Sequence, residues 1–498
     1  MTIHLSIVLW LPLAAGLLGL LSRSRRVAGV LALLGTGATL AYAILLLADF
    51  ERGGGLQHVT DVNWIPTLGI HYKLGIDGLN VVLIVLAAAL WLAATAWVLR
   101  ERRDRTPLFL FWLSMGLSGV LGALMAQDLA LFVLFFDLML VPFVFLTLGW
   151  GGPQRSAATL KFFIYTLVGS LLMLTGAIAT GALADRGDGL TFVLSDLAQR
   201  PLGEGTQDWI FLFFAAAFLV KMPAFPLHGW MPDAYRNIPL PALAVFSAVL
   251  SKVAAYGFLK IALPLYPAAA SRFQDLLLLV GLASVLYGSI MAFTTTQTRL
   301  VLGYSSIAQL GFIVLGIFAL DDRGAQGALL QSINHGLVVA PAFFIVALLA
   351  ARAGGSEDLR DMGGLAMRAP LLQVLFLVVA FANLAMPGTA NFVGEFLILL
   401  GVFETSPVIA VLAFAGVALA AVYTLRLFIR SMHNRQGERA ASSDVPVRDG
   451  LVLVPLVVAI VALALYPQLP LEKSERTVTQ AIERAQAADG QGAEEARR

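Results

Sequence analysis

Long apolar segments recur along the whole sequence, and they constrain its fold more than any other feature. A helix needs about 20 mainly apolar residues to cross the hydrocarbon core of a bilayer. Of the 498 residues, 59% are hydrophobic and only 13% are charged, whereas a soluble domain has about 25% charged residues. We therefore predict an all-α polytopic membrane protein with about 14 transmembrane helices. The predicted spans are residues 3–21, 27–49, 78–99, 107–126, 129–150, 158–184, 208–231, 241–264, 274–294, 299–320, 325–350, 371–402, 407–430 and 450–467.

Composition and motifs exclude several classes of function. Cysteine is absent, so this chain forms no disulfide and ligates no metal or iron–sulfur cluster through thiolates. No nucleotide-binding or zinc motif is present, so we expect this chain to bind no cofactor and no metal. Because the sequence has no long run of basic residues, we expect no nucleic-acid partner. The first apolar segment is followed by Arg23, Arg25 and Arg26, the reverse of a cleavable signal peptide, and is predicted to be the first span.

The basic residues of the short loops predict the orientation in the membrane. Those after odd-numbered spans are Arg23, Arg25, Arg26, Arg100, Arg102, Arg103, Arg105, Arg155, Lys161, Arg236, Arg299, Arg352, Arg360, Arg368, Arg430, Arg435 and Arg439. The opposite loops have isolated charges at Arg52, Lys73, Arg186, Arg200, Arg272 and Arg323. Because cytoplasmic loops are enriched in arginine and lysine, we expect both termini on the non-cytoplasmic side.

Two predicted spans are interrupted by proline. The seventh contains Pro223 shortly after Lys221, and the twelfth contains Pro387 followed by Gly388. Proline removes a backbone donor, and such breaks persist in a membrane only inside the protein or beside water. Two broken spans, five apart, predict inverted five-helix repeats formed by spans 4–8 and 9–13.

This repeat hypothesis divides the chain into five parts. We predict N-terminal helices at 1–106, a first repeat at 107–270, a second at 271–430, the last transmembrane helix at 431–470 and a short polar tail at 471–498. Each repeat would contain one proton half-channel. Polar external connections are expected at 51–77 and 185–207, and the tail is expected to form a surface helix.

Five ionisable residues lie deep within apolar spans: Asp137, Lys221, Lys252, His335 and Glu395. A charge near the bilayer centre costs about 2.5–3.5 kcal/mol on insertion scales, so five such charges cost roughly 12 kcal/mol unless they are paired or hydrated. Static ion pairs between helices are the structural alternative. Two static pairs would leave one residue over, which favours a functional reason for the set.

Asp137 and Lys221 are predicted to form the central pair. Pro142 loosens the helix after Asp137, and Pro223 breaks the helix after Lys221. A nearby carboxylate favours the charged lysine, whereas burial favours the neutral one. Separating the two side chains would therefore release a proton. A static pair would use the same two residues.

The other ionisable residues each have a structural alternative. Lys252 could extend its amine to the interface, and His335 could simply hydrogen-bond between helices. Glu395 could cap the second half of the broken twelfth span. His228, beside Trp230, could be merely interfacial.

Three motifs give the chain a family resemblance. Residues 161–170 (KFFIYTLVGS), 221–234 (KMPAFPLHGWMPDA) and 303–312 (GYSSIAQLGF) resemble the proton-conducting antiporter-like family. That family includes the L, M and N subunits of bacterial NADH-quinone oxidoreductase (respiratory complex I) and the multisubunit sodium/proton antiporters. The resemblance extends over most of the chain.

Within the family, two stretches resemble the M subunits. They are residues 64–80 (WIPTLGIHYKLGIDGLN) and 386–396 (MPGTANFVGEF). The second ends around Glu395, where L, N and antiporter relatives usually have lysine. The tail is also too short to form the lateral helix of an L subunit.

The resemblance implies a role for each ionisable residue. Asp137 matches the acidic modulator, Lys221 the lysine that takes protons from the cytoplasmic half-channel, and Glu395 the exit-side residue. Lys252 and His335 match the central relay. Secondary candidates within the motifs are Lys161, His228 and Tyr304.

Three departures from the family pattern bear on these roles. The family usually has Glu at Asp137, so the shorter side chain reaches less far towards Lys221. Gln309 stands where histidine is frequent, which weakens a relay through the start of the tenth span. Asn237 replaces a common Glu or Gln in a loop.

The leading hypothesis is a proton-translocating membrane-arm subunit driven by redox chemistry elsewhere in its complex. The resemblance implies L and N subunits as neighbours, NADH, FMN, iron–sulfur clusters and quinone in partner subunits, and the bacterial inner membrane as location. One alternative is a subunit of a sodium/proton antiporter or of a membrane-bound hydrogenase-type complex. Another is an inactive spacer that retains the fold.

Overall fold

The computed structural model describes residues 4–53, 55–101, 103–187, 189–433 and 443–495. Arg102, Arg435 and Arg439 of the orientation argument lie outside these ranges. The helices of the first half are α1 (Leu5–Leu21), α2 (Arg25–Asp49), α3 (Val81–Arg100), α4 (Thr106–Met125), α5 (Leu129–Leu138), α6 (Val141–Trp150), α7 (Arg155–Leu183), α8 (Leu194–Leu197), α9 (Glu204–Lys221), α10 (Met231–Asn237), α11 (Leu240–Val245), η2 (Phe246–Leu250), α12 (Ser251–Gly257), η3 (Phe258–Ala262) and α13 (Leu263–Leu265).

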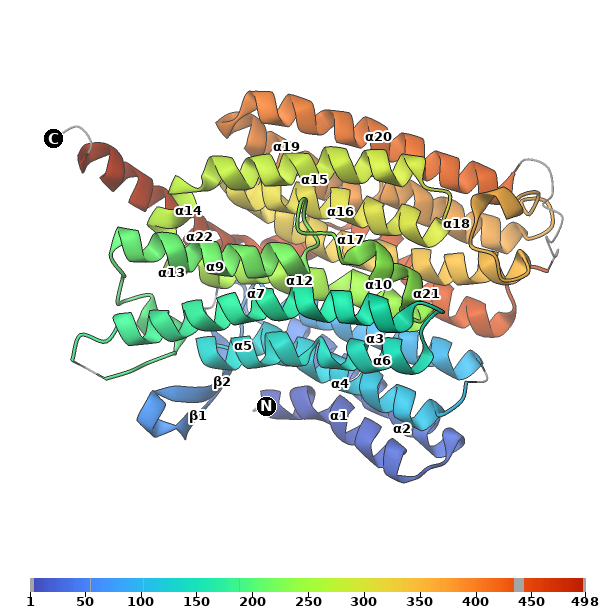
Figure 1. Cartoon of the computed structure of the whole chain (residues 1–498), viewed down its shortest axis with the longest axis horizontal. Helices are drawn as coiled ribbons and strands as arrows, with labels where there is room; N and C mark the ends of the chain where they lie inside the picture. Colours follow the sequence, from blue (N-terminus) through green and yellow to red (C-terminus); the bar gives the residue numbers. More distant parts are fainter. Residues whose placement is uncertain (1–3, 54, 102, 188, 434–442, 496–498) are drawn as a thin grey trace.

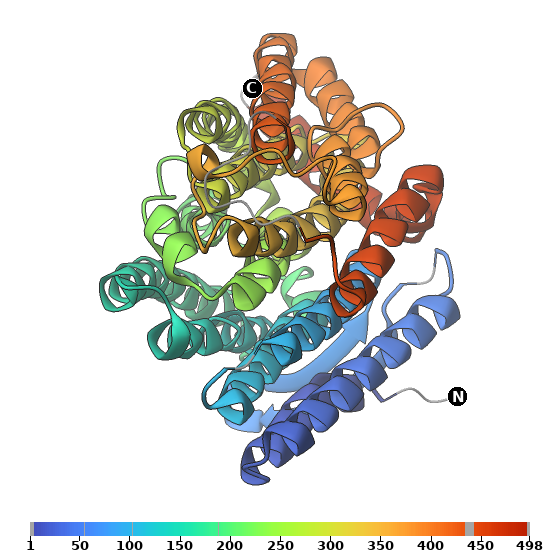
Figure 2. The ribbon, with the colours of Figure 1, turned by 90° about the vertical axis from the view of Figure 1, so that its right-hand side faces the viewer.

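The second half consists of helices and short helical turns. They are α14 (Pro267–Arg272), α15 (Gln274–Thr294), α16 (Thr298–Phe318), α17 (Asp322–Arg352), η4 (Leu359–Asp361), α18 (Pro370–Asn383), α19 (Ala390–Thr405), α20 (Pro407–Met432), α21 (Val447–Leu465) and α22 (Gln468–Glu495). Figure 1 shows the long helices running along one common direction, with their connections gathered at the two ends. Figure 2, turned by 90°, shows how they pack side by side.

The apolar segments form helices as the sequence predicts. In the described ranges, 11 helices are long and apolar enough to cross a membrane. The remaining predicted spans correspond to the shorter helix α1 and to the interrupted segments α9–α10 and α18–α19. A polytopic helical membrane protein is therefore confirmed, and the number of crossings remains a prediction.

Both predicted helix breaks are present. Residues 222–230 separate α9 from α10, and residues 384–389 separate α18 from α19. The repeat hypothesis rests on these two breaks, and the five-part division of the chain stays a prediction. Two π-helical turns that flank α12, η2 and η3, were not predicted from the sequence. A π-turn comes from the packing of a helix against its neighbours rather than from a local residue signal.

The connection at 51–77 departs from an all-helical fold. Strands β1 (Gln57–Ile65) and β2 (Ile70–Ile76) form an antiparallel hairpin around the short turn η1 (Pro66–Leu68). Gly69 ends this turn at φ 63°, and a Cβ there would lie 1.9 Å from the Leu190 carbonyl oxygen. The hairpin therefore packs closely against the 185–207 connection.

The connections divide between the two ends of the bundle. The α3–α4 and α6–α7 turns and residues 353–369 lie at the right-hand end in Figure 1. The hairpin, α8 and α22 lie at the left-hand end. Helix α22 is the expected surface helix, and it packs on α13, α14 and α17, with Gln486 donating to the Leu320 carbonyl at 2.8 Å.

Candidate functional site

Asp137 and Lys221 form the predicted pair. The Lys221 Nζ donates to Asp137 Oδ1 at 3.0 Å and to the Phe136 carbonyl at 2.8 Å. The same Nζ lies 3.6 Å from the centre of the Phe136 ring. Ser170 of α7 donates a further hydrogen bond to Asp137 Oδ1. The shorter aspartate therefore reaches the lysine directly in this structure.

The helix breaks explain this geometry. Helix α5 ends at Leu138, so the Phe136 carbonyl lies in its last turn, where carbonyls have no intrahelical donor. The backbone N–H of Leu140 donates to the Asp137 backbone carbonyl instead. Lys221 is the last residue of α9, and its amine satisfies the free carbonyl. Two interrupted helices are thus joined end to end through one ammonium group.

The two members of the pair differ in exposure. The Lys221 side chain is 2% exposed, whereas the Asp137 side chain is 40% exposed. The ammonium lies inside the bundle and the carboxylate lies at its edge. A group outside this chain can therefore approach the carboxylate without entering the core.

Close packing of α4 sets the position of the α5–α6 turn. A Cβ on Gly119 would lie 2.6 Å from the Met139 Cα, two residues after Asp137, whereas nothing lies within 4 Å of a Cβ on Gly149. We expect Gly119→Ala to lower the free energy of unfolding by about 1–3 kcal/mol, because backbone must move to admit the methyl group. Thermal unfolding of the detergent-solubilised protein measures this. Gly149→Ala is the matched control, and equal stability of both variants would contradict the packing argument.

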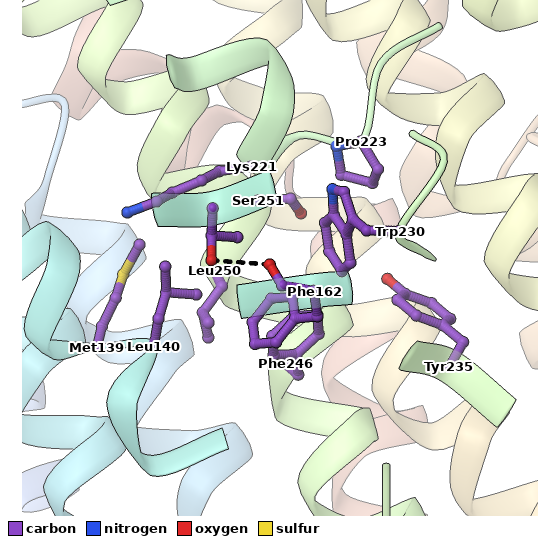
Figure 3. A pocket seen from close by; sticks show the side chains of 11 residues that line it. Met139, Leu140, Phe162, Lys221, Pro223, Trp230, Tyr235, Phe246, Leu250 and Ser251 are labelled. Atoms are coloured by element: carbon purple, nitrogen blue, oxygen red, sulfur yellow. Dashed lines mark hydrogen bonds between the residues drawn. The ribbon is translucent and has the colours of Figure 1, made fainter. Parts of the chain in front are cut away.

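A narrow cavity separates Lys221 from the next ionisable helix. Its volume is about 10 Å³, room for roughly one water molecule. Figure 3 shows the Lys221 side chain extending along one edge, with its nitrogen directed away from Trp230. Ser251 of α12 lies between Lys221 and Trp230 in this view, and Tyr235 lies beyond Trp230. The cavity links the end of α9 to the segment that contains Lys252.

Lys252 lies at the start of α12, directly after the π-turn η2. Its Nζ donates to the Ser247 carbonyl at 2.8 Å and to Ser251 Oγ at 3.1 Å. The residue is 1% exposed, so the alternative of an amine that extends to the interface is wrong. No carboxylate pairs with this amine within the described part of the chain.

His335 lies on α17, which packs against η2 and α12. Neither ring nitrogen has a hydrogen-bond partner among the described residues. A histidine that serves as a structural link between helices needs such a partner, so this alternative loses its support. The free nitrogens leave the ring available to accept and donate a proton.

Glu395 lies on α19, past its first turn. Its Oε1 accepts from Gln309 Nε2 at 2.7 Å and from Gln331 Nε2 at 3.4 Å, and its Oε2 has no partner in the described ranges. The side chain bonds to two glutamines of α16 and α17 rather than to a backbone N–H, so the cap alternative is wrong. Gln309 therefore binds Glu395 directly, although it replaces the more frequent histidine.

Sequence reasoning missed the amides around Glu395. Gln331 donates to Gln309 at 2.5 Å, and Asn334 donates to the Ala390 carbonyl at 2.6 Å. Both amide atoms of Asn391 are buried without a partner in the part of the chain described. Helices α17 and α19 approach closely here, since a Cβ on Gly394 would lie 2.5 Å from Gln331 Oε1. The spacing of these amide side chains, three or four residues apart within an apolar span, would have indicated that they lie on one helix face near Glu395.

The secondary candidates lie apart from these groups. Lys161 pairs with Asp233 at 2.8 Å on the surface. His228 lies in the α9–α10 connection with its ring 4.6 Å from that of Tyr287, and Tyr287 and Tyr304 are 6.3 Å apart. Asn237 accepts from the Gln154 N–H at 3.1 Å and ties the α6–α7 turn.

Comparison with known proteins decides the family. Residues 126–420 match the family described as "NADH:quinone oxidoreductase/Mrp antiporter, TM". NADH-quinone oxidoreductase subunit M of Rhodobacter capsulatus is 36% identical over 485 residues, which covers 93% of each chain. The chain belongs to this family. The resemblance to M subunits within it is confirmed.

Solved structures agree with this assignment. A chain of respiratory complex I from Thermus thermophilus superposes with a TM-score of 0.89 at 30% identity, covering 97% of this chain and 100% of that one. A chain of the Mrp complex from Dietzia sp. has a TM-score of 0.85 at 21% identity, covering 98% and 100%, which shows a shared fold. The family's helical membrane fold is therefore confirmed, whereas the role of each ionisable residue remains a prediction.

Proposed function

We propose that this chain moves protons across the membrane as the M subunit of an NADH-quinone oxidoreductase. The observation that carries the proposal is the Asp137–Lys221 pair, whose ammonium is buried and whose carboxylate reaches the edge of the bundle. A charge on a neighbouring subunit can draw the carboxylate away. The buried lysine then loses its counter-charge, and burial favours its neutral form.

The proton released by Lys221 has a short route onwards. It passes through the water-sized cavity to Ser251 and the neutral amine of Lys252, which becomes charged. From Lys252 the relay continues through the unpaired ring of His335 to the amide-bound carboxylate of Glu395. When the Asp137 carboxylate moves back to Lys221, it again favours the charged form of the lysine. Lys221 then takes its next proton from the cytoplasmic side.

Redox chemistry supplies the driving force from outside this chain. Because no cysteine is present, this chain has no thiolate ligand for an iron–sulfur cluster. On the family resemblance, we place NADH, FMN, iron–sulfur clusters and quinone in partner subunits, and no catalytic redox site in this one. The exposed face around Asp137 is the place for a neighbouring membrane-arm subunit, with L and N as the expected neighbours. Glu395 and the M-type relatives disfavour the antiporter and hydrogenase-type alternatives.

The aspartate variants test the proposed switch. We expect Asp137→Asn to reduce redox-driven proton pumping strongly, because an amide holds the geometry but cannot stabilise the charged lysine. Asp137→Glu keeps the charge and should retain pumping. Proton uptake by inverted membrane vesicles, divided by the rate of NADH oxidation, is the measurement. Equal pumping by Asp137→Asn and the parent would contradict the switch.

The orientation can be tested because the chain has no cysteine of its own. Ser156, in the first turn of α7, and Ser195, within α8, are both exposed and lie at opposite ends of the bundle. With both termini outside the cytoplasm, Ser195→Cys should react with a membrane-impermeant maleimide in spheroplasts. Ser156→Cys should react only in inverted vesicles. The reverse pattern would overturn the orientation.

A further inference from the structure

Helices α17 and α19 pack against each other along a seam that begins with glycines. A Cβ on Gly401 would lie 2.5 Å from the Gly324 backbone nitrogen, and a Cβ on Gly327 would lie 2.7 Å from the Ile398 backbone nitrogen. Residue numbers rise along α17 as they fall along α19, so the two helices run antiparallel. With backbones this close, the seam has no room for water at its glycine end.

One turn further along α17, the seam becomes polar. Gln331 meets α19 at Gly394, and Asn334 donates to the Ala390 carbonyl at 2.6 Å. The same antiparallel alignment brings Asn391 of α19 level with Asn334. Amide side chains therefore take over where the glycines end.

His335 stands at the edge of this seam. It follows Gln331 by four residues, which places the two on neighbouring positions of α17. The next residue, Gly336, faces η2, since a Cβ there would lie 2.7 Å from the Ala248 carbonyl oxygen. His335 therefore lies between the side of α17 that meets η2 and the side that meets α19. This position suits a proton that comes from the Lys252 segment and continues to α19.

Buried polar atoms without a partner are concentrated along this seam. In the part of the chain that the structure describes, they are both ring nitrogens of His335, Asn334 Oδ1, Gln331 Oε1, both amide atoms of Asn391 and Glu395 Oε2. All five residues are at most 3% exposed. Buried polar groups are costly when they stay unpaired, and ordered water commonly satisfies them. A run of such atoms along one helix contact indicates that water belongs there.

Asn391 is the central member of the run. It precedes Glu395 by four residues, so the two side chains are neighbours on α19, with about 5–6 Å between their Cβ atoms. Its amide does not cap the helix, because α19 begins after Thr389 without a side-chain cap and Asn391 Oδ1 has no partner among the described residues. An apolar side chain of similar size would avoid the cost of a buried amide. The amide therefore needs an explanation other than stability.

We propose that Asn391 is a positioning residue that holds water between His335 and Glu395. This inference rests on the proposed proton-pumping function and supplies the step between these two groups, which share no hydrogen bond within the described ranges. The Asn391 Nδ2–H donates to the water oxygen, and Oδ1 accepts from one water O–H group. The other O–H group is then directed to Glu395 Oε2.

The transfer leaves Asn391 unchanged. The protonated ring of His335 gives its N–H proton to the water oxygen while an O–H proton of the same water passes to Glu395 Oε2. The ring becomes neutral, the carboxylate becomes a carboxylic acid and the water is restored. Asn391 gains and loses no proton, so its contribution is the orientation of the water.

The test compares Asn391→Val with Asn391→Thr in the whole complex reconstituted in liposomes. The two side chains have nearly the same volume and shape, and only threonine has a hydroxyl that donates to and accepts from water. A packing defect would affect both variants equally. Thr39→Val is the matched control, because it makes the same exchange at a buried hydroxyl of α2 that bonds to the Gly35 carbonyl at 2.8 Å. Protons translocated per NADH oxidised are measured for each, beside Glu395→Gln as the reference for loss of the relay.

We expect Asn391→Val to lose as much pumping as Glu395→Gln does, and Asn391→Thr to keep most of the parental pumping. Thr39→Val should pump as the parent does. Equal pumping by Asn391→Val and Asn391→Thr, with Glu395→Gln defective, would overturn the water-holding role and leave the proposed function intact. Parental pumping by both Glu395→Gln and Lys221→Ala would overturn the proposed function itself. If the valine and threonine variants fail to assemble, Asn391→Ala and Asn391→Ser, which differ by the same hydroxyl in less space, decide in the same way.

Discussion

Lys221→Ala is expected to abolish the contribution of this subunit to proton pumping. The amine contacts both the Asp137 carboxylate and the Phe136 carbonyl, and alanine can neither hold nor release a proton there. Asp137 would also lose its cation, and an unpaired charge in a membrane-buried position is costly. Protons translocated per NADH oxidised in reconstituted liposomes give the measure.

Lys161→Ala is the matched control for this substitution. Lys161 is also a lysine in an ion pair with an aspartate, but the pair lies on the surface, with 44% and 36% of the two side chains exposed. Surface ion pairs contribute about 0–1 kcal/mol, so pumping and assembly should be preserved. Parental pumping by Lys221→Ala would refute its place in the relay.

Glu395→Gln is expected to have the second large effect. Glutamine occupies nearly the same volume and can accept from Gln309 as Glu395 does at 2.7 Å. The fold should therefore persist while the ability to take up a proton is lost. We expect pumping to fall as far as in Lys221→Ala, with an unchanged thermal unfolding temperature.

Glu395→Asp is the control that separates charge from packing. Aspartate keeps an ionisable carboxyl group but withdraws it by one methylene, so partial pumping is expected. A lowered unfolding temperature in Glu395→Gln would point to a structural role. Full pumping by Glu395→Gln would remove Glu395 from the path.

The Asp137–Lys221 contact could be predicted from sequence because both residues stand beside helix breaks in apolar segments. The cost of isolated charges in lipid requires a partner, and the prolines indicate where helices end. The same reasoning could not find the Phe136 carbonyl as a second acceptor, since that depends on where α5 ends. It also could not show that the Asp137 carboxylate lies at the edge of the helix bundle.

The amides around Glu395 and the ion pair that Lys260 of η3 forms with Asp77 escaped prediction for a different reason. Asp77 and Lys260 are 183 residues apart and lie near the ends of their predicted spans, where charges are common and need no explanation. Gln331 and Asn391 carry no charge, so they did not stand out from the apolar background. Only the packing of α17 against α19 brings them to the carboxylate.

The hairpin at 51–77 shows the same limit at the level of the fold. Composition correctly indicated a polar connection but could not indicate strand pairing, which is set by the register across Gly69 and by contact with the 185–207 connection. By contrast, the apolar segments became helices as predicted because a membrane-spanning backbone must satisfy its own hydrogen bonds.

If Lys221 and Glu395 act on one proton path, a double variant of the two residues will show it. Groups that act as one unit are not additive, so the Lys221→Ala, Glu395→Gln protein should pump as many protons per NADH oxidised as either single variant does. If each single variant loses only part of the pumping and the double variant loses the sum of both parts, the two residues lie on independent paths. That result would contradict a single relay through Lys221 and Glu395.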